Sequence, residues 1–316
     1  MDAFLRGPVT VTNIRHAVRS GAVGPAGLSV LVVEATSPPC YLLGTEKGGR
    51  RVLLHLPGAR IRFPAGLLPV HAGLLETVTI KEEKDRLILE LSLVHPTRLN
   101  LCRTDGLPAL LRVEMNREPL YRIMRGRRIL LDPAHGGEEA GGKGPVDLRE
   151  KDKVFALALL LRRLLVELGA TVYLTREADR NPPLSVRRTL VHQLQPEAVI
   201  LLHLGRFAEA ARGGFRTAWA NEEGRSLAAT IHDALTRTLP LPDRGWGMGP
   251  PWGIRGIPVV VVEVATITNP VEEGWLRSGT FLRRAARAIA NGLKDYLARG
   301  EGRETTAASI SFPGGQ

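Results

Sequence analysis

The first part of the chain contains short apolar runs with the alternation that is typical of β-strands. In residues 87–93, leucine occupies every second position and alternates with isoleucine, glutamate and serine, which predicts a strand with one buried face. Turn residues, such as those at 46–49, separate the runs. The other strands predicted here cover residues 28–35, 50–56 and 75–80. Because no helix pattern interrupts them, we predict a small antiparallel β-sandwich over residues 1–122.

From about residue 123 onward, runs of strand length alternate with longer helix patterns. The clearest helix covers residues 150–168, where apolar side chains recur on one face and Gly169 follows as a C-terminal glycine. Further helices are predicted at 184–194, 223–238 and 279–298, and strands at 127–132, 171–176, 198–203, 215–220 and 257–264. This alternation predicts an α/β domain at 123–298, with a mostly parallel sheet and helices on both faces. A short linker near 117–128 precedes it, and a polar, disordered tail at 299–316 follows it.

The length of the chain bears on the number of domains, and its charge bears on the kind of partner. The chain has 316 residues, which suggests two domains, and 44% of them are hydrophobic, as in ordinary globular proteins. The formal net charge of +11 favours anionic partners, although general solubility is the alternative interpretation. Aromatic residues make up only 5% of the chain and do not interleave with the basic ones. Nucleic acid is therefore not the expected partner.

Other sequence features bear on the compartment. No apolar run approaches the roughly 20 residues of a membrane span, and the first residues lack the apolar segment of a secretory signal. The two cysteines, Cys40 and Cys102, are too few for a disulfide-rich scaffold or a cysteine-rich zinc module. They could form one bridge or remain as two buried free thiols.

Four polar residues in the second half of the chain stand at strand ends or at a helix start: His135, Glu150, His203 and Glu263. Parallel α/β sheets gather their active-site residues at such positions. Two histidines and a carboxylate can bind zinc while leaving one position open for water, and a further carboxylate can move protons. The alternatives are an ordinary loop histidine at 135 and, at Glu150, a carboxylate that is favoured simply by the first turn of a helix.

The segments around these residues resemble the catalytic domain of zinc-dependent N-acetylmuramoyl-L-alanine amidases. The resemblance covers roughly residues 127–298. It is carried, in this order, by DPAHGG at 132–137, EK at 150–151, LLHLG at 201–205, VE at 262–263 and TNP at 268–270.

The resemblance implies one Zn²⁺ per chain, bound by His135, Glu150 and His203, with Glu263 as the catalytic glutamate. It implies hydrolysis of the amide bond between N-acetylmuramic acid and L-alanine in peptidoglycan. The place of action would then be extracytoplasmic, in the cell wall or periplasm. We also expect Gly136 and Gly137 to let the backbone pass close to the metal.

Two further residues are candidates for the site, and some positions depart from the family pattern. Arg244 could pair with Glu263 or bind a substrate carboxylate, and a surface ion pair is the alternative. His192 stands where the family usually has asparagine, so it is a candidate neighbour of the site or simply a packing residue. The Ala-Asn that usually follows the second histidine is replaced by Leu204 and Gly205, which puts substrate positioning in doubt.

The β region resembles the AMIN domain that often precedes amidase domains and helps to target them to the envelope. The resemblance rests on strand order, on RRVLLHLPGARI at 50–61 and on VTIKEEKDRLILEL at 78–91. It implies a targeting domain, and the basic surface could bind anionic cell-wall polymers; an unrelated β domain is the alternative. For the whole chain, two other functions stay open: a different zinc peptidase acting on stem peptides, and a non-catalytic wall-binding or scaffold protein.

Overall fold

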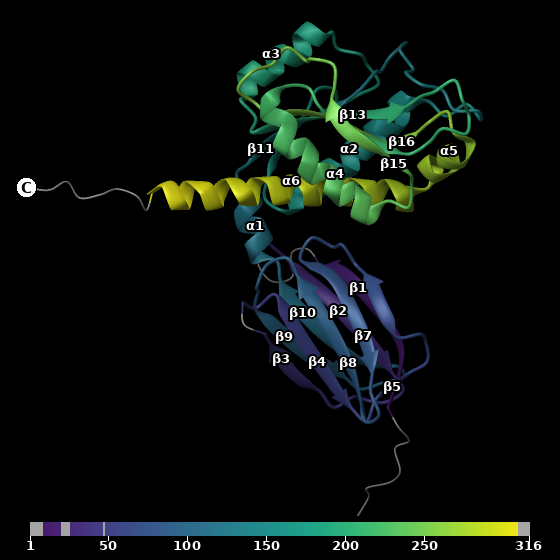
Figure 1. Ribbon diagram of the computed structural model, residues 1–316, viewed down its shortest axis with the longest axis vertical. Helices are drawn as coiled ribbons and strands as arrows, with labels where there is room; N and C mark the ends of the chain where they lie inside the picture. Colours follow the sequence, from purple (N-terminus) through teal and green to yellow (C-terminus); the bar gives the residue numbers. More distant parts are fainter. Residues whose placement is uncertain (1–8, 20–25, 47, 309–316) are drawn as a thin grey trace, which may run out of the picture. The chain divides into compact units, whose positions relative to one another are not determined.

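The chain folds into two compact units, Met1–Arg122 and Ile123–Gln316, in a computed structural model that describes residues 9–19, 26–46 and 48–308 (Figure 1). The first unit is built from strands, and the second combines strands with helices. The predicted fold class is confirmed. The segment predicted as a linker contains a short helix, α1 (Glu118–Met124), which begins where the Asn116 side chain accepts a hydrogen bond of 2.7 Å from the backbone N–H of Glu118.

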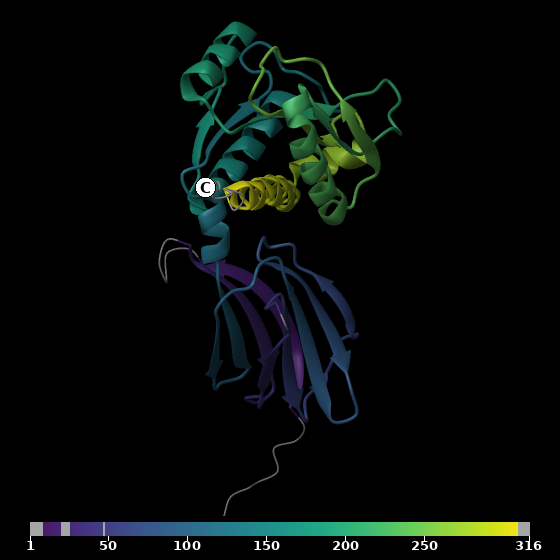
Figure 2. The ribbon, with the colours of Figure 1, turned by 60° about the vertical axis from the view of Figure 1, so that its left-hand side comes forward.

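The first unit consists of two five-stranded sheets, which Figure 2 shows as two layers. Their strand orders are β5-β1-β2-β10-β9 and β3-β4-β8-β7-β6, and all neighbours are antiparallel except β1 and β5. The strands are β1 (Thr10–Arg19), β2 (Leu28–Ala35), β3 (Leu42–Thr45), β4 (Arg51–Pro57), β5 (Arg60–Ile61), β6 (Gly66–Pro69), β7 (Leu75–Glu82), β8 (Arg86–Leu93), β9 (Leu99–Thr104) and β10 (Ala109–Asn116). The leucines of β8 are buried, as their alternation predicts, but Ile88 and Glu90 on the other face are buried as well.

Several strands of this unit were not predicted, for two different reasons. β10 has a clear alternation, with Ala109, Leu111, Val113 and Met115 fully buried, so its signal was present in the sequence and overlooked. β1 has little such signal, because Val11 is its one buried residue. Both cysteines of the chain are free, and Cys40 is exposed rather than buried.

The second unit contains a six-stranded sheet with the order β12-β11-β13-β16-β14-β15. Neighbouring strands are parallel except β14 and β16, which are antiparallel. The strands are β11 (Arg128–Pro133), β12 (Thr171–Leu174), β13 (Ala198–Gly205), β14 (Phe215–Trp219), β15 (Asp243–Met248) and β16 (Val259–Thr266). The helices are α2 (Glu150–Glu167), α3 (Leu184–Leu194), a 3₁₀ turn η1 (Glu222–Gly224), α4 (Arg225–Thr238), α5 (Pro270–Arg277) and α6 (Gly279–Ala308).

Helices cover both faces of this sheet, as predicted (Figure 1). Helices α2 and α4 both pack against α6 on one face. On the other face, Val191 of α3 packs on Leu130 of β11, on Val199 of β13 and on Val259 of β16. The long apolar strands at the centre of the sheet are therefore buried on both sides, and their carboxyl ends carry the polar residues considered below.

Three elements of the second unit differ from prediction. Strand β15 lies in a glycine-rich segment without alternation and was not predicted. Helix α5 was missed although Asn269 caps it, accepting hydrogen bonds from the backbone N–H of Val271 and Glu272. Helix α6 runs on to Ala308, so the disordered tail predicted from residue 299 is wrong up to that point; residues 309–316 lie outside the described part. Among the described helices, none is long and apolar enough to cross a bilayer.

Candidate metal centre and active site

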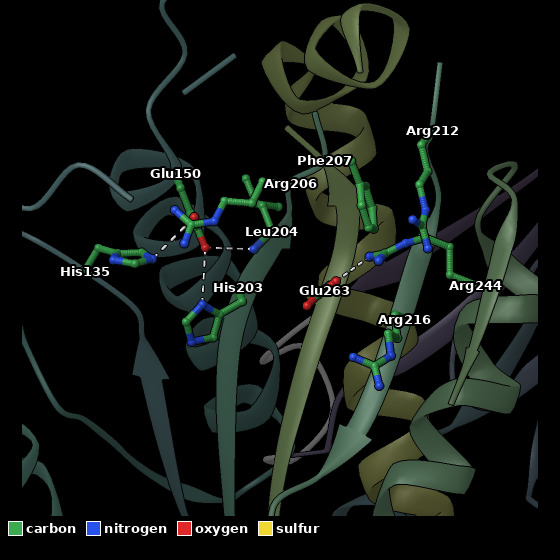
Figure 3. A pocket seen from close by; sticks show the side chains of 10 residues that line it. All are labelled: His135, Glu150, His203, Leu204, Arg206, Phe207, Arg212, Arg216, Arg244 and Glu263. Carbon is green, nitrogen blue, oxygen red and sulfur yellow. Dashed lines mark hydrogen bonds and ion pairs between the residues drawn. The ribbon is translucent and has the colours of Figure 1, made fainter. Parts of the chain in front are cut away.

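Three of the predicted site residues come together at the carboxyl ends of the central strands (Figure 3). His135 follows β11, His203 lies near the end of the neighbouring parallel strand β13, and Glu150 is the first residue of α2. The Nε2 atom of His135 is 3.3 Å from Oε2 of Glu150, and Nδ1 of His203 is 3.2 Å from Oε1 of the same carboxylate. One ligand atom from each residue lies within 4.8 Å of the others, so together they could hold a metal ion.

Glu150 is the electrostatic centre of this group, and its side chain is only 3% exposed. Its oxygens accept hydrogen bonds from the backbone N–H of Gly142 at 2.7 Å and of Leu204 at 2.9 Å. Burial raises the pKa of Glu150, but the contacts with His135 and His203 and these two backbone donors outweigh it and hold the pKa well below its usual range. Glu150 therefore carries a negative charge at neutral pH, as a metal ligand must.

The backbone passes closest to the candidate ligands at Gly141 rather than at Gly136. A Cβ atom on Gly141 would lie 2.4 Å from Cδ2 of His135 and 2.8 Å from Oε2 of Glu150, and its φ is +71°. A Cβ atom on Gly136 would instead lie 2.2 Å from the carbonyl oxygen of Arg180. The expected reason for glycine at 136 was therefore wrong, because this residue makes room for a neighbouring loop.

A chain of polar contacts holds the imidazole of His135 on its Nδ1 side, away from Glu150. Its Nδ1 is 2.7 Å from Oε1 of Glu139, which leaves Nε2 directed toward Glu150. Asn181 donates a hydrogen bond to Glu139, and Arg187 donates to Asn181 at 2.6 Å and also contacts Asp132. The hydrogen bond with Glu150 raises the pKa of His135, against the effect of burial. These contacts fix the orientation of the ring.

Glu263 lies directly beside His203, because the two are register partners on the neighbouring parallel strands β16 and β13. Its carboxylate accepts a hydrogen bond from Nη2 of Arg244, and Nε of Arg244 donates to the carbonyl of Gly214 at 3.0 Å. The side chains of Glu263 and Arg244 are 21% and 12% exposed, so this ion pair lies in the wall of the site rather than on the open surface. Of the alternatives for Arg244, the pair with Glu263 is the one formed.

Arg244 also gives a physical reason for the unusual Gly205. A Cβ atom on Gly205 would lie 2.6 Å from Nη2 of Arg244 and 2.8 Å from Oγ1 of Thr266. The space that a side chain at 205 would need is therefore filled by the guanidinium that holds Glu263. The asparagine expected at this position could not be added here without displacing Arg244.

These residues surround a pocket of about 420 Å³ (Figure 3). Its walls also contain Leu204, Phe207 and three arginines that the sequence analysis did not single out: Arg206, Arg212 and Arg216. Arg206 and Phe207 follow His203 closely in the sequence, and this could have predicted that they line the pocket. Arg216 could not be predicted in this way, because it lies at the pocket through the pairing of β14 with β16. His192 is exposed on α3 and is not among the residues that line the pocket.

Comparison with known proteins concerns the second unit. Residues 129–295 match the family model described as N-acetylmuramoyl-L-alanine amidase. The chain is 27% identical over 191 residues to the probable cell wall amidase LytH of Staphylococcus saprophyticus, covering 59% of this chain and 64% of LytH. The corresponding protein of Staphylococcus epidermidis is 29% identical over 178 residues, covering 55% and 60%. The chain thus spans less than two thirds of the length of these relatives.

Solved structures give the same result for the fold. The catalytic domain of CwlV, an N-acetylmuramoyl-L-alanine amidase from Bacillus (Paenibacillus) polymyxa var. colistinus, matches with a TM-score of 0.52 and 27% identity, covering 54% of this chain and 98% of that one. The amidase AmiC2 of Nostoc punctiforme matches with a TM-score of 0.53 and 24% identity, covering 55% and 98%. The second unit therefore has the fold of these domains.

Proposed function

The chain belongs to the N-acetylmuramoyl-L-alanine amidase family, and on that premise we propose that its second unit hydrolyses the amide bond between N-acetylmuramic acid and L-alanine in peptidoglycan. The observation that carries the proposal is the convergence of His135, Glu150 and His203 at one point, with Glu263 beside them in the same pocket. Two histidines, one carboxylate ligand and one further carboxylate form a set of groups that can support amide hydrolysis at a metal.

Zinc is the cofactor that we propose, with one ion per chain. Ligands about 2.0–2.2 Å from a tetrahedral zinc ion lie roughly 3.3–3.5 Å from one another. Nε2 of His135 lies 3.3 Å from Oε2 of Glu150 and Nδ1 of His203 lies 3.2 Å from its Oε1, which is near that spacing, and one ligand atom from each of the three residues lies within 4.8 Å of the others. Three protein ligands leave the fourth position free, as in catalytic rather than structural zinc sites.

Each nearby side chain then has a definite part in the reaction. Zinc, when bound, acts as a Lewis acid toward the amide carbonyl and lowers the pKa of water. Glu263 accepts a proton from the attacking water and returns it to the amine that leaves. Arg244 orients the Glu263 carboxylate through their ion pair. Glu139 fixes the ring of His135 so that its Nε2 faces the metal position.

Product analysis tests this function. Zinc-loaded protein is incubated with peptidoglycan, and the released material is analysed by mass spectrometry, with Glu263→Gln as the matched control. We expect intact stem peptides with a free N-terminal alanine, together with glycan strands that have lost their peptides. Cleavage within the peptide would instead identify a zinc peptidase. Binding to wall material without any release would identify a non-catalytic scaffold protein.

For the first unit, we propose an AMIN-like role in attaching the protein to the envelope, outside the cytoplasm. Two features support this: its sandwich of two five-stranded sheets, and its position before an amidase-family domain. Lysine and arginine also outnumber aspartate and glutamate in residues 1–122, which favours anionic cell-wall polymers as the bound material.

A further inference from the structure

The pocket contains more positive charge than its own carboxylates can balance. Four guanidinium groups line it against only two carboxylates, those of Glu150 and Glu263. Arg244 is paired with Glu263, while Glu150 is engaged by the two histidines. Within the described part of the chain, none of the three other arginines has a carboxylate at ion-pair distance: Arg206, Arg212 and Arg216. A concave site with unbalanced guanidinium groups attracts an anionic group of the ligand.

From this we propose that Arg212 and Arg216, assisted by Arg206, form a subsite that binds a free carboxylate of the peptide whose alanine amide is cleaved. The subsite would make the enzyme selective for stem peptides with a carboxylate, rather than a carboxamide, close to the scissile bond. This inference rests on the proposed amidase function and specifies its substrate class.

Phe207 gives two of the arginines a fixed geometry. The guanidinium carbon of Arg212 lies 4.0 Å from the centre of the Phe207 ring, and that of Arg244 lies 5.0 Å from it. The backbone N–H of Phe207 in turn donates a hydrogen bond of 3.0 Å to the Thr268 side chain. A guanidinium stacked on a ring keeps its N–H groups in the plane free to donate, and it loses little additional entropy when a carboxylate binds bidentately.

Arg216 is placed by sheet register. It is the direct partner of Glu263 across the antiparallel strands β14 and β16, and its side chain is partly buried in the pocket wall. The order β13-β16-β14-β15 therefore places His203, Glu263, Arg216 and Arg244 on four consecutive strands. Figure 3 shows the same sequence across the pocket, with the histidines on one side of Glu263 and Arg212, Arg216 and Arg244 on the other.

This arrangement determines which part of the substrate meets the arginines. Glu263 gives its proton to the leaving amine, and that amine belongs to the peptide. Because Glu263 stands between the histidines and most of the arginines, the peptide extends over β14 and β15 and the sugar lies on the side of His135. One peptide residue spans roughly 3.5 Å, so a carboxylate on the second residue reaches about one residue beyond the amine. The α-carboxylate of a γ-linked D-glutamate at that position fits this requirement.

The experiment compares two dipeptides that differ only in that group. Calorimetric titration of the zinc-loaded full chain uses the γ-methylamides of L-alanyl-D-glutamate and of L-alanyl-D-isoglutamine, so that the blocked γ-carboxyl cannot bind and only the α-group differs between carboxylate and carboxamide. We expect the carboxylate to bind about tenfold more tightly, which corresponds to one charge-assisted hydrogen-bond pair in a partly open site. In Arg216→Gln and in Arg212→Gln the ratio should fall toward 1. Arg212 is exposed, so the second variant leaves the buried core of the unit unchanged.

Arg284→Gln is the matched control, because it removes one positive charge from an exposed position on α6 that does not line the pocket. It should keep the tenfold ratio. Equal affinities of the two dipeptides for the unaltered protein, absence of binding by either, or an equal loss of both affinities in Arg216→Gln would overturn the subsite.

The same two dipeptides attached to N-acetylmuramic acid separate this proposal from the function on which it rests. Hydrolysis of both compounds at equal kcat/KM, with equal dipeptide affinities, would leave the amidase function standing and remove the subsite. Hydrolysis of neither compound, with the carboxylate preference intact in the titrations, would remove the reaction and leave the anion subsite.

Discussion

The two units of this protein treat buried carboxylates in different ways. In the first unit, Glu90 of β8 is paired with Arg51 on β4 and with Lys81 on β7, the two strands beside it in the same sheet. In the second unit, Glu150 is approached by His135, His203 and two backbone N–H groups that come from distant parts of the sequence. The partners of Glu90 come from neighbouring strands of its own sheet. The donors to Glu150 come from separate segments that meet at the wall of a pocket.

The comparison shows what a lowered carboxylate pKa means in each place. Hydrogen bonds from Arg51 and Lys81 lower the pKa of Glu90 to about 2, and both partners keep their own exposed surface. The pKa of Glu150 is lowered by groups that are themselves potential metal ligands. A lowered carboxyl pKa thus accompanies a structural ion pair in one unit and a candidate site in the other, and geometry distinguishes them.

The largest effect is expected from His203→Ala, which removes a candidate ligand of the second unit. Loss of one of three protein ligands should remove most of the zinc and reduce hydrolysis below the level of every other variant described here. Metal analysis of the purified protein measures the first, and product release measures the second. His192→Ala is the matched control, since this histidine is exposed on α3 outside the pocket. A His203→Ala protein with one zinc per chain would refute the ligand assignment.

Glu263→Gln should have the next largest effect. The change preserves shape but removes the proton acceptor, so the rate should fall by roughly 10²–10⁴ while zinc stays bound. Steady-state kinetics and metal analysis are made on the same sample. Full activity with unchanged zinc would make Glu263 a structural partner of Arg244. Loss of zinc would make it a ligand, and Glu150 would then be explained by its place in the first turn of α2.

Glu139→Gln tests a residue that contacts a candidate ligand without being one. Because Glu139 only orients the ring of His135, zinc affinity should fall by about 10–100-fold, as it does when such outer partners are lost. Competition with a chelator measures that affinity. The neighbouring Glu138 is exposed and outside the pocket, so Glu138→Gln should behave as the unaltered protein. Equal affinities in the two variants would mean that Glu139 does not orient His135.

In the first unit, the Glu90 ion pairs predict a smaller, pH-dependent effect on stability. The pKa of Glu90 is lower in the folded state, so its stabilisation is present above the ordinary value near 4.5 and is lost as the pH falls toward about 2. Since Arg51 and Lys81 are about half exposed, we expect at most about 2 kcal/mol. Denaturation of residues 1–122 at pH 7 and pH 3 measures it. In Glu90→Gln, the unfolding free energy should change less between these pH values.

The smallest effect concerns binding by the first unit. If anionic polymers are bound through its excess of basic residues, retention of residues 1–122 on wall material should weaken as salt rises, because exposed charges are screened within about 10 Å at 0.1 M salt. Cosedimentation at low and high salt measures it. Unchanged retention would exclude an electrostatic contribution, and no retention at either concentration would exclude the targeting role.

Much of the fold was predictable because it depends on local pattern. The leucines of 87–93 and the apolar strand at 198–203 are visible in the sequence, and His203 stands at the end of such a strand. Arg216 could not be found in this way, because its place beside Glu263 depends on the antiparallel pairing of β14 with β16 in a sheet that is otherwise parallel. Glu139 was missed for a related reason: its contact with His135 depends on the turn between them.

Gly205 has a consequence for how this site can change during evolution. Any side chain at 205 would collide with the guanidinium of Arg244, and any loss of Arg244 would leave Glu263 without its partner. The two positions are therefore expected to be epistatic: either substitution alone should be costly, and their effects should not add when both are made. A lineage could restore a side chain at 205 only together with a shorter residue at 244 and a different way of holding the glutamate.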